Sequence, residues 1–395
     1  MKKTMALVLA GALLLAGCGA KQEQPVPQLE VPETITAVKP MPDPLILRYV
    51  DQVREEHGKE RLYLTMSHRM PKVFLPGSPE VSQLLNQAIT ESDQAYFKGD
   101  PKNENFGRGF DAYALESQQL FKEDPVPYGP MTVAKNTELT QISEVLLSWV
   151  STESIGRGGP YASQHTESFV YDLRTGARLT LEDLALEPEA LRNYLAAAIV
   201  EQAMNSPEIQ GSIAWYAPDE YEEVLPGLIR EGSWSVTRDG IQISSQEEEL
   251  GPHAAGTVSF VVSFNRLQDL LKPEYLPGPL EKAKGTLTVA APEGCNARII
   301  DDLVLDDQGQ TILISVRGRV RNVTVSGSQY LGEEGFIMSW PIWQASFLED
   351  CALRLQAVLP DAAPNLMVSY EDQEGLHSYL LAQSGKDGSY FLMDP

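Results

Sequence analysis

Hydrophobic and polar positions follow two different periods along the first part of the chain. Pro79 follows Ser78, and apolar residues then recur with helical spacing at 81, 84, 85, 88 and 89, which predicts an amphipathic helix. The segments 62–75 and 140–150 are rich in β-branched and aromatic residues, which predicts strands. The polar, glycine-containing stretch from 99 to 110 is predicted to be a loop.

The middle of the chain mixes strand and helix signals. A strand over 168–173 is expected to turn at 174–176 and to continue as a second short strand over 179–184. Pro188 opens a second amphipathic helix, and Asp239-Gly240 marks the turn of a hairpin over 234–244. Another strand is predicted over 257–264 and a short helix over 267–271. This pattern predicts an α+β fold, with helices packed on a mostly antiparallel sheet.

The pattern changes after the proline-rich segment 273–279. From residue 285 onward, short apolar strands are separated by Gly, Asp and Pro turns, which predicts a β-sandwich-like C-terminal domain. We therefore expect three folded parts: an upstream α+β subdomain over 45–155, a second subdomain over 156–281 and the β-rich domain over 282–395.

The first eighteen residues have the pattern of a signal peptide. Lys2 and Lys3 precede the apolar run 5–15, which is shorter than the roughly 20 residues that span a bilayer. Leu15 to Cys18 resembles the bacterial lipobox, which implies that Cys18 carries the lipid; the alternative is an ordinary signal peptide cleaved near a cysteine. Residues 19–44 are rich in proline and are predicted to be a tether.

Composition limits the partners. The chain has 395 residues, 43% of them hydrophobic, and a formal net charge of −24. This charge makes nucleic acid and anionic lipid surfaces poor partners and favours a cationic protein, although solubility alone is an alternative explanation. Outside the signal peptide the cysteines are Cys295 and Cys351; an extracytoplasmic setting predicts a disulfide between them, and two buried free thiols are the alternative.

Two groups of motifs occur between residues 158 and 276. The first is the double glycine at 158–159, followed by 171–176 and 179–184; the second is 249–256, followed by 270–274. Their order and spacing resemble DUF3298, a family of domains of unknown function that includes the RsiV-like extracellular module of lysozyme-sensing anti-sigma factors. The preceding segment, from about 60 to 150, resembles the small PdaC/RsiV-type domain (DUF4163). The resemblance implies lysozyme as a partner.

Turn chemistry explains most residue types in these motifs, so we interpret them as scaffold, with a direct role in binding as the alternative. The scaffold residues are Gly158, Gly159, Asp172, Thr175, Gly176, Asp183, Pro252 and Gly256. The chain departs from the family where Pro160-Tyr161 replaces Ala-His and where Glu248 and His253 replace Tyr. Around these departures lie the candidate partner-binding residues, namely Tyr161, His165, Glu247, Glu248, Glu249 and His253.

Catalytic motifs are not evident in the sequence. There is no zinc-binding histidine pair, no nucleophile elbow and no Walker loop, and we expect neither a cofactor nor a metal. The aspartates at 301, 302, 306 and 307 suit turns better than a calcium loop, and Trp340 and Trp343 suit a core better than an exposed ligand platform.

The sequence thus favours a non-catalytic binding lipoprotein, tethered to the outer face of the bacterial cell membrane through Cys18. The alternative is a peptidoglycan-associated enzyme or an accessory subunit of a cell-wall enzyme.

Replacing Cys18 with Ser tests the anchor. Because the predicted lipid is attached to this sulfur, we expect the Cys18→Ser chain expressed in bacteria to lose fatty-acid labelling and to leave the membrane fraction. The matched control, Cys295→Ser, is expected to remain labelled and bound to the membrane. A labelled, membrane-bound Cys18→Ser protein would contradict the lipobox interpretation.

Overall fold

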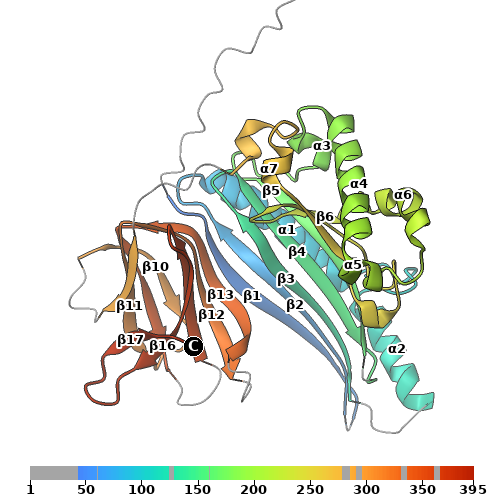
Figure 1. The fold of residues 1–395 in the computed structure, drawn as a ribbon. Helices are drawn as coiled ribbons and strands as arrows, with labels where there is room; N and C mark the ends of the chain where they lie inside the picture. Colours follow the sequence, from blue (N-terminus) through green and yellow to red (C-terminus); the bar gives the residue numbers. More distant parts are fainter. Residues whose placement is uncertain are drawn as a thin grey trace, which may run out of the picture. The chain divides into compact units, whose positions relative to one another are not determined.

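The structure is a computed structural model. It describes residues 43–59, 61–123, 129–159, 161–277, 285–290, 296–330, 336–359 and 365–395, so the predicted signal peptide, with Cys18, and nearly all of the predicted tether lie outside the described residues. Residues Pro40–Pro395 form one compact unit. Its described residues form a mixed fold, dominated by one large and mostly antiparallel sheet, as the predicted α+β class requires (Figure 1). No described helix is long and apolar enough to cross a membrane.

The large sheet contains strands from all three predicted parts of the chain. Every neighbouring pair is antiparallel except β2 and β3, which are parallel. In spatial order the strands are β17 (Tyr390–Met393), β16 (Gly375–Gln383), β15 (Asn365–Asp372), β12 (Arg319–Tyr330), β13 (Phe336–Glu349), β1 (Ile46–His57), β2 (Leu62–Phe74), β3 (Met131–Ile142), β4 (Leu146–Gly156) and β5 (Ala162–Asp172).

A four-stranded sheet packs near the C-terminal half of the large sheet. Its order is β10 (Arg298–Val304), β14 (Cys351–Ala357), β11 (Gln310–Arg317) and β9 (Thr286–Ala290). Apolar side chains of this sheet and of β12, β13 and β15 form one buried cluster around Trp343, which is fully buried. Asp301 of β10 accepts hydrogen bonds from Arg48 Nε at 3.0 Å and Trp343 Nε1 at 2.9 Å, and so joins the two sheets.

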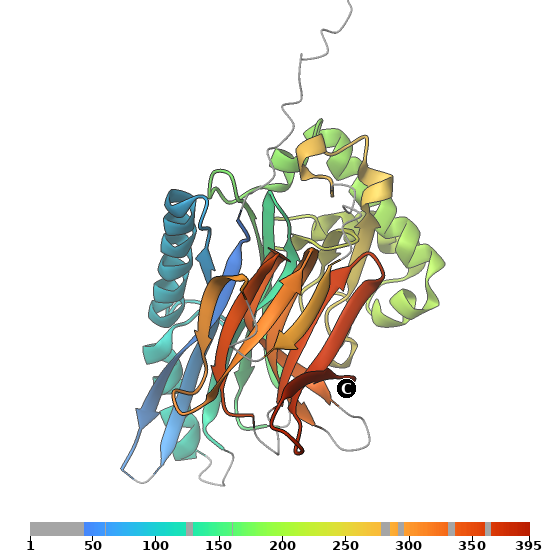
Figure 2. The same ribbon diagram turned by 90° about the vertical axis from the view of Figure 1, so that its left-hand side faces the viewer.

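Helices α1 (Pro79–Lys98) and α2 (Phe110–Glu123) cover one face of the sheet near β2 to β5 (Figure 2). The predicted helix start at Pro79 is confirmed, and Leu85 and Ile89 of its apolar stripe are buried. The predicted loop follows α1. Gly99 and Gly109, both with positive φ, lie so close that a Cβ on Gly99 would sit 2.0 Å from the Gly109 nitrogen, so the loop closes only with glycine there.

The segment after β5 forms helices and a three-stranded sheet on the opposite face of β4, where Val236 N donates to Ser148 Oγ at 3.1 Å. The predicted hairpin at Asp239-Gly240 is confirmed. The elements are α3 (Leu181–Leu184), α4 (Pro188–Asn205), α5 (Pro207–Ser212), η1 (Pro218–Glu220), α6 (Tyr221–Val224), η2 (Leu225–Leu228), β6 (Trp234–Val236), β7 (Gly240–Ser244), η3 (His253–Ala255), β8 (Ser259–Ser263), α7 (Phe264–Leu267) and η4 (Pro273–Tyr275).

Two local predictions in this segment are wrong. Residues 181–184 form helix α3 and not a strand, because Thr180 and Asp183 make a capping box: Asp183 Oδ2 accepts from Thr180 N at 2.8 Å, and Thr180 Oγ1 accepts from Asp183 N at 3.3 Å. The short helix expected over 267–271 lies instead at Phe264–Leu267, directly after β8.

The predicted disulfide is not seen. Cys351 is a buried free thiol, and Cys295 lies outside the described residues. Burial raises the pKa of the Cys351 thiol, so its sulfur stays protonated within the apolar cluster around Trp343. For Cys351, the structure thus contains the buried thiol and not the disulfide.

Removal of the Asp301 carboxylate is expected to destabilise the protein. Asp301→Ala removes the carboxylate that accepts from Arg48 Nε and from the Trp343 indole N–H, which costs about 2 kcal/mol or more in the free energy of unfolding. The neighbouring Asp302 pairs with Arg354 on the exposed surface, so Asp302→Ala is expected to cost less than about 1 kcal/mol. Urea unfolding of both variants measures the difference, and equal midpoints would contradict this account of the junction.

Candidate functional site

Four polar side chains lie opposite one another across the sheet. His68 of β2 pairs with Lys135 of β3, Lys135 pairs with Glu153 of β4, and Glu153 pairs with His165 of β5. Directly opposite residues on neighbouring strands project from the same face, with strands about 4.8 Å apart. We call this set, His68, Lys135, Glu153 and His165, the polar row.

The polar row interrupts the core beneath α1 and α2. On one side lies an apolar cluster that includes Met66, Val133 and Ile155, and on the other a cluster that includes Trp149 and Phe169. Within the row His68 and Glu153 are buried, whereas Lys135 is partly exposed and His165 is exposed. A buried ionisable group is costly unless it has a partner. Such a row, placed where apolar residues would stabilise the sheet, is therefore a candidate functional site.

A cavity of about 320 Å³, a volume within the range of small-ligand pockets, lies over Lys135, Glu153 and His165 of the polar row. Residues of α1, the loop after it and strands β3 to β5 line the cavity, which is partly open to solvent. The lining residues are Ser92, Ala95, Tyr96, Asn103, Phe106, Gly107, Lys135, Ser151, Glu153, His165 and Glu167.

The carboxylate of Glu153 is held in a fixed orientation at the cavity floor. Its side chain is buried, Tyr113 donates its hydroxyl to Oε1 at 2.9 Å, and the backbone N–H of Gly107 donates to Oε2 at 3.1 Å. Gly107 has a φ of +65°, the left-handed conformation that glycine adopts readily. Burial, together with the nearby Glu153, raises the pKa of Tyr113, so its hydroxyl remains a donor.

His68 and Asp93 form a buried pair at the other end of the row. Nδ1 of His68 lies 2.7 Å from Oδ1 of Asp93, and both side chains are almost fully buried. Burial lowers the pKa of His68 and Lys135 lowers it further, while Asp93 opposes the shift. The imidazole is therefore neutral at pH 7.

Lys135 lies between these pairs without a polar partner. Its Nζ is 5.6 Å from the centre of the Tyr96 ring and 6.0 Å from that of Phe169. Among the residues that the structure describes, none accepts a hydrogen bond from this ammonium or forms an ion pair with it. At the end of the row, His165 stacks on Phe106 with ring centres 5.3 Å apart.

Three of the six predicted partner-binding residues come together on the surface. His253 Nδ1 lies 3.1 Å from Glu247 Oε1, and the ring of Tyr161 meets that of His253 edge to face at 5.5 Å. Tyr161 is 75% exposed, the highest value among the exposed large hydrophobic side chains described. We call Tyr161, Glu247 and His253 the surface cluster.

The other three predicted residues lie elsewhere or have other partners. His165 lines the cavity. Glu249 forms a two-point ion pair with Arg230, at 2.6 and 2.8 Å, and therefore joins its loop to the segment between η2 and β6. Glu248 occupies a turn with a φ of +60°.

Two side chains of the same loop bind the outer edge of β5. The amide of Gln246 accepts from Thr166 N at 2.9 Å and donates to Thr166 O at 2.7 Å, as a neighbouring strand would. Glu247 accepts from Gln164 N at 2.7 Å. The loop that carries the surface cluster is thus fixed to the sheet by hydrogen bonds to backbone groups.

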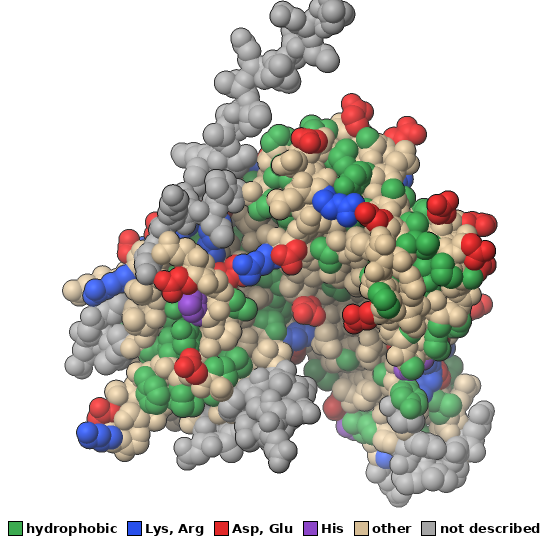
Figure 3. Space-filling view, viewed as in Figure 1, with side chains coloured by type: hydrophobic (Ala, Val, Ile, Leu, Met, Phe, Trp, Pro, Cys, Tyr) green, Lys and Arg blue, Asp and Glu red, His purple; other side chains and the backbone are tan. Residues whose placement is uncertain are grey.

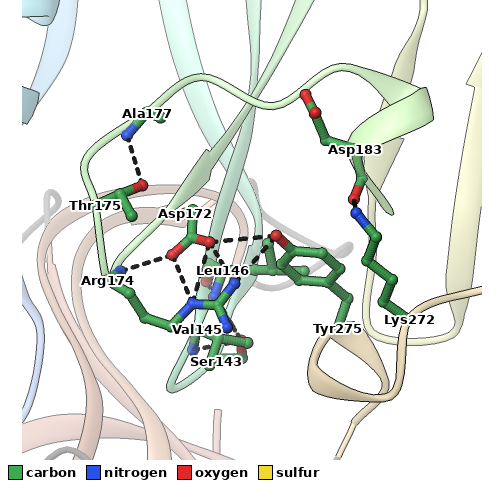
Figure 4. A network of polar contacts seen from close by, with 10 residues as sticks. All are labelled: Ser143, Val145, Leu146, Asp172, Arg174, Thr175, Ala177, Asp183, Lys272 and Tyr275. Atoms are coloured by element: carbon green, nitrogen blue, oxygen red, sulfur yellow. Dashed lines mark hydrogen bonds and ion pairs between the residues drawn. The ribbon is translucent and has the colours of Figure 1, made fainter. Parts of the chain in front are cut away.

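The motif residue Asp172 anchors the turn after β5 (Figure 4). Arg174 donates to Asp172 Oδ1 through its backbone N–H at 2.7 Å and its Nε at 2.9 Å, and the Tyr275 hydroxyl donates to Oδ2 at 3.2 Å. Burial alone would raise the pKa of Asp172, but these hydrogen bonds outweigh burial and lower it. Burial raises the pKa of Tyr275 to about 12, so Tyr275 stays a donor.

The remaining motif residues also lie in turns or at helix starts. Thr175 Oγ1 accepts from Ala177 N at 3.2 Å, and Lys272 Nζ donates to the carbonyl of Asp183 at 2.7 Å (Figure 4). Positive φ values occur at Gly158, Gly176 and Gly256, Gly159 lies beside Gly158, and Pro252 directly precedes η3. No group of His, Cys, Asp or Glu within the described ranges could hold a metal ion.

The known proteins that this chain resembles are solved structures. Neither a protein-family model nor a curated protein sequence matches the chain. A member of the DUF3298 family from Bacteroides fragilis is similar at 12% identity and a TM-score of 0.39, covering 57% of this chain and 94% of its own. A DUF3298 family protein from Pseudomonas aeruginosa is similar at 13% identity and a TM-score of 0.40, covering 60% and 97%.

The Asp172 carboxylate is expected to make stability depend on pH. Because its folded pKa is below the unfolded value of about 3.9, its contribution is present above that value and is lost as the pH falls through the folded pKa. We expect Asp172→Asn to lower the free energy of unfolding by about 1–3 kcal/mol at neutral pH and by less at about pH 3. Urea unfolding at the two pH values measures this; for the exposed Asp51→Asn, little change is expected at either.

Proposed function

We propose that the chain is a surface-tethered, non-catalytic binding lipoprotein of the cell envelope. In this proposal Cys18 carries the lipid anchor on the outer face of the bacterial membrane, and the folded part captures a cationic, envelope-directed protein. The observation that carries the proposal is the surface cluster, in which a 75% exposed Tyr161 stands beside His253 and the carboxylate of Glu247.

Exposed tyrosines beside charged groups are typical anchors of protein interfaces, since one ring buries a large area at a small cost in conformational entropy. Gln246 and Glu247 hold the loop of the cluster to β5, so little ordering is needed on binding. The net charge of −24 favours encounter with a cationic partner. Acidic side chains are spread over the surface formed by α4 and α6 (Figure 3).

The partner that the family resemblance implies is lysozyme. The departures from the family pattern at Tyr161, Glu248 and His253 leave room for another cationic protein at the same surface. We also infer that the four-stranded sheet and the C-terminal strands of the large sheet form a β-sandwich-like domain, because residues of both contribute to one cluster around Trp343.

Calorimetry with the full chain and hen-type lysozyme, at low and moderate salt, tests this function. We expect binding that weakens with salt, and a loss of affinity of about tenfold or more for Tyr161→Ala. The control Leu376→Ala removes an apolar side chain that is 63% exposed on β16 and is expected to bind as the unchanged protein does.

Two results would count against the proposal. Absence of binding at both salt concentrations would exclude lysozyme as the partner. Release of sugar or acetate from purified peptidoglycan by the full chain would favour the alternative, a peptidoglycan-associated enzyme, over a non-catalytic binding protein.

A further inference from the structure

We propose that the cavity over the polar row binds a small zwitterion, an α-amino acid or a dipeptide, with the ligand carboxylate on Lys135 and its ammonium on Glu153 and Glu167. This site is separate from the surface cluster and does not depend on capture of a protein. The cavity of about 320 Å³ is large enough for a molecule of that size.

Lys135 supplies the positive end of the site. Its ammonium lies over the rings of Tyr96 and Phe169 and, within the described part of the chain, meets no hydrogen-bond acceptor. Ring contacts stabilise the charge but provide no acceptor for the N–H donors. A ligand carboxylate in the cavity would satisfy them with charge-assisted hydrogen bonds.

Glu153 and Glu167 supply the negative end. The Tyr113 hydroxyl and the Gly107 N–H occupy only part of the hydrogen-bonding capacity of Glu153, since a carboxylate accepts about four hydrogen bonds. Glu167 is paired with Arg178 through Oε1 at 3.3 Å. These carboxylates lie on β4 and β5, beside the strand that carries Lys135, so opposite charges face one cavity.

Charge complementarity favours a zwitterion over other small ligands. The carboxylates of Glu153 and Glu167 would repel a purely anionic ligand, and the ammonium of Lys135 would repel a purely cationic one. A neutral sugar would leave the ammonium without a charged acceptor. Phe106 and Ala95 provide apolar surface for a small side chain, whereas Ser92 and Asn103 offer further hydrogen bonds.

Calorimetry with the full chain tests the site, with L-alanine and L-alanyl-L-alanine as probes. N-acetyl-L-alanyl-L-alanine lacks the ammonium, L-alanyl-L-alanine amide lacks the carboxylate, and N-acetylglucosamine is the neutral arm. We expect a free amino acid or dipeptide to bind, each blocked peptide to bind about tenfold more weakly or worse, and the sugar not to bind.

Variants assign the two ends of the ligand. Lys135→Met is expected to weaken the binding of L-alanyl-L-alanine about tenfold or more. The variant is expected to bind L-alanyl-L-alanine amide no more weakly than the unchanged protein does. Glu167→Gln, at a partly exposed position, is expected to weaken the binding of the dipeptide but not the binding of its N-acetyl form. The matched control is Lys72→Met, which removes an exposed lysine that also lies over a ring, that of Phe74 at 5.6 Å, outside the cavity.

The proposal is overturned if neither probe binds, if the sugar binds and the zwitterions do not, or if Lys135→Met and Lys72→Met bind the dipeptide equally. Thermal unfolding of both lysine variants ensures that a loss of binding is not a loss of folding. Lysozyme binding by Lys135→Met is expected to be unchanged, so the two sites are tested independently.

Discussion

The architecture depends on β1, which is hydrogen-bonded on both of its edges. Three residues, Ile46 to Arg48, pair with β13 from the far end of the chain, whereas the whole of β1 pairs with β2. This shared strand makes one ten-stranded sheet from segments that the sequence pattern assigns to separate parts. Asp301 reinforces the junction by accepting hydrogen bonds from Arg48 and Trp343, so hydrogen bonds also join the four-stranded sheet to strands β1 and β13 of the large sheet.

Elements with local signals were predictable, and elements defined by distant contacts were not. Pro79 and Pro188 mark helix starts and Asp239-Gly240 marks a hairpin, because each signal acts within a few residues. Strand β1 gave no such signal, since most of its residues after Arg48 are exposed and polar, and only its partners make it a strand. The strand expected over 179–184 failed because the capping box at Thr180 outweighs the apolar alternation.

The surface cluster and the polar row also differ in how far the sequence predicts them. The residues of the surface cluster were identified because they lie in or beside family motifs, although their meeting in space depends on Gln246 and Glu247. Of the polar row, only His165 was among the predicted partner-binding residues. His68, Lys135 and Glu153 were missed, because each is a single polar residue in a separate strand. Only the register of four strands aligns the row, and a single sequence does not specify register across a parallel pair such as β2 and β3.

The hydrogen bonds of Gln246 and Glu247 to β5 have a consequence for recognition. An unprotected outer strand invites β-augmentation, in which another polypeptide adds to the sheet through its backbone. Here two side chains already occupy the backbone groups of Gln164 and Thr166. A partner at this edge must therefore bind side chains such as Tyr161 and not the backbone of the strand. Binding then depends on the side chains of the partner, and uncontrolled polymerisation through this edge is limited.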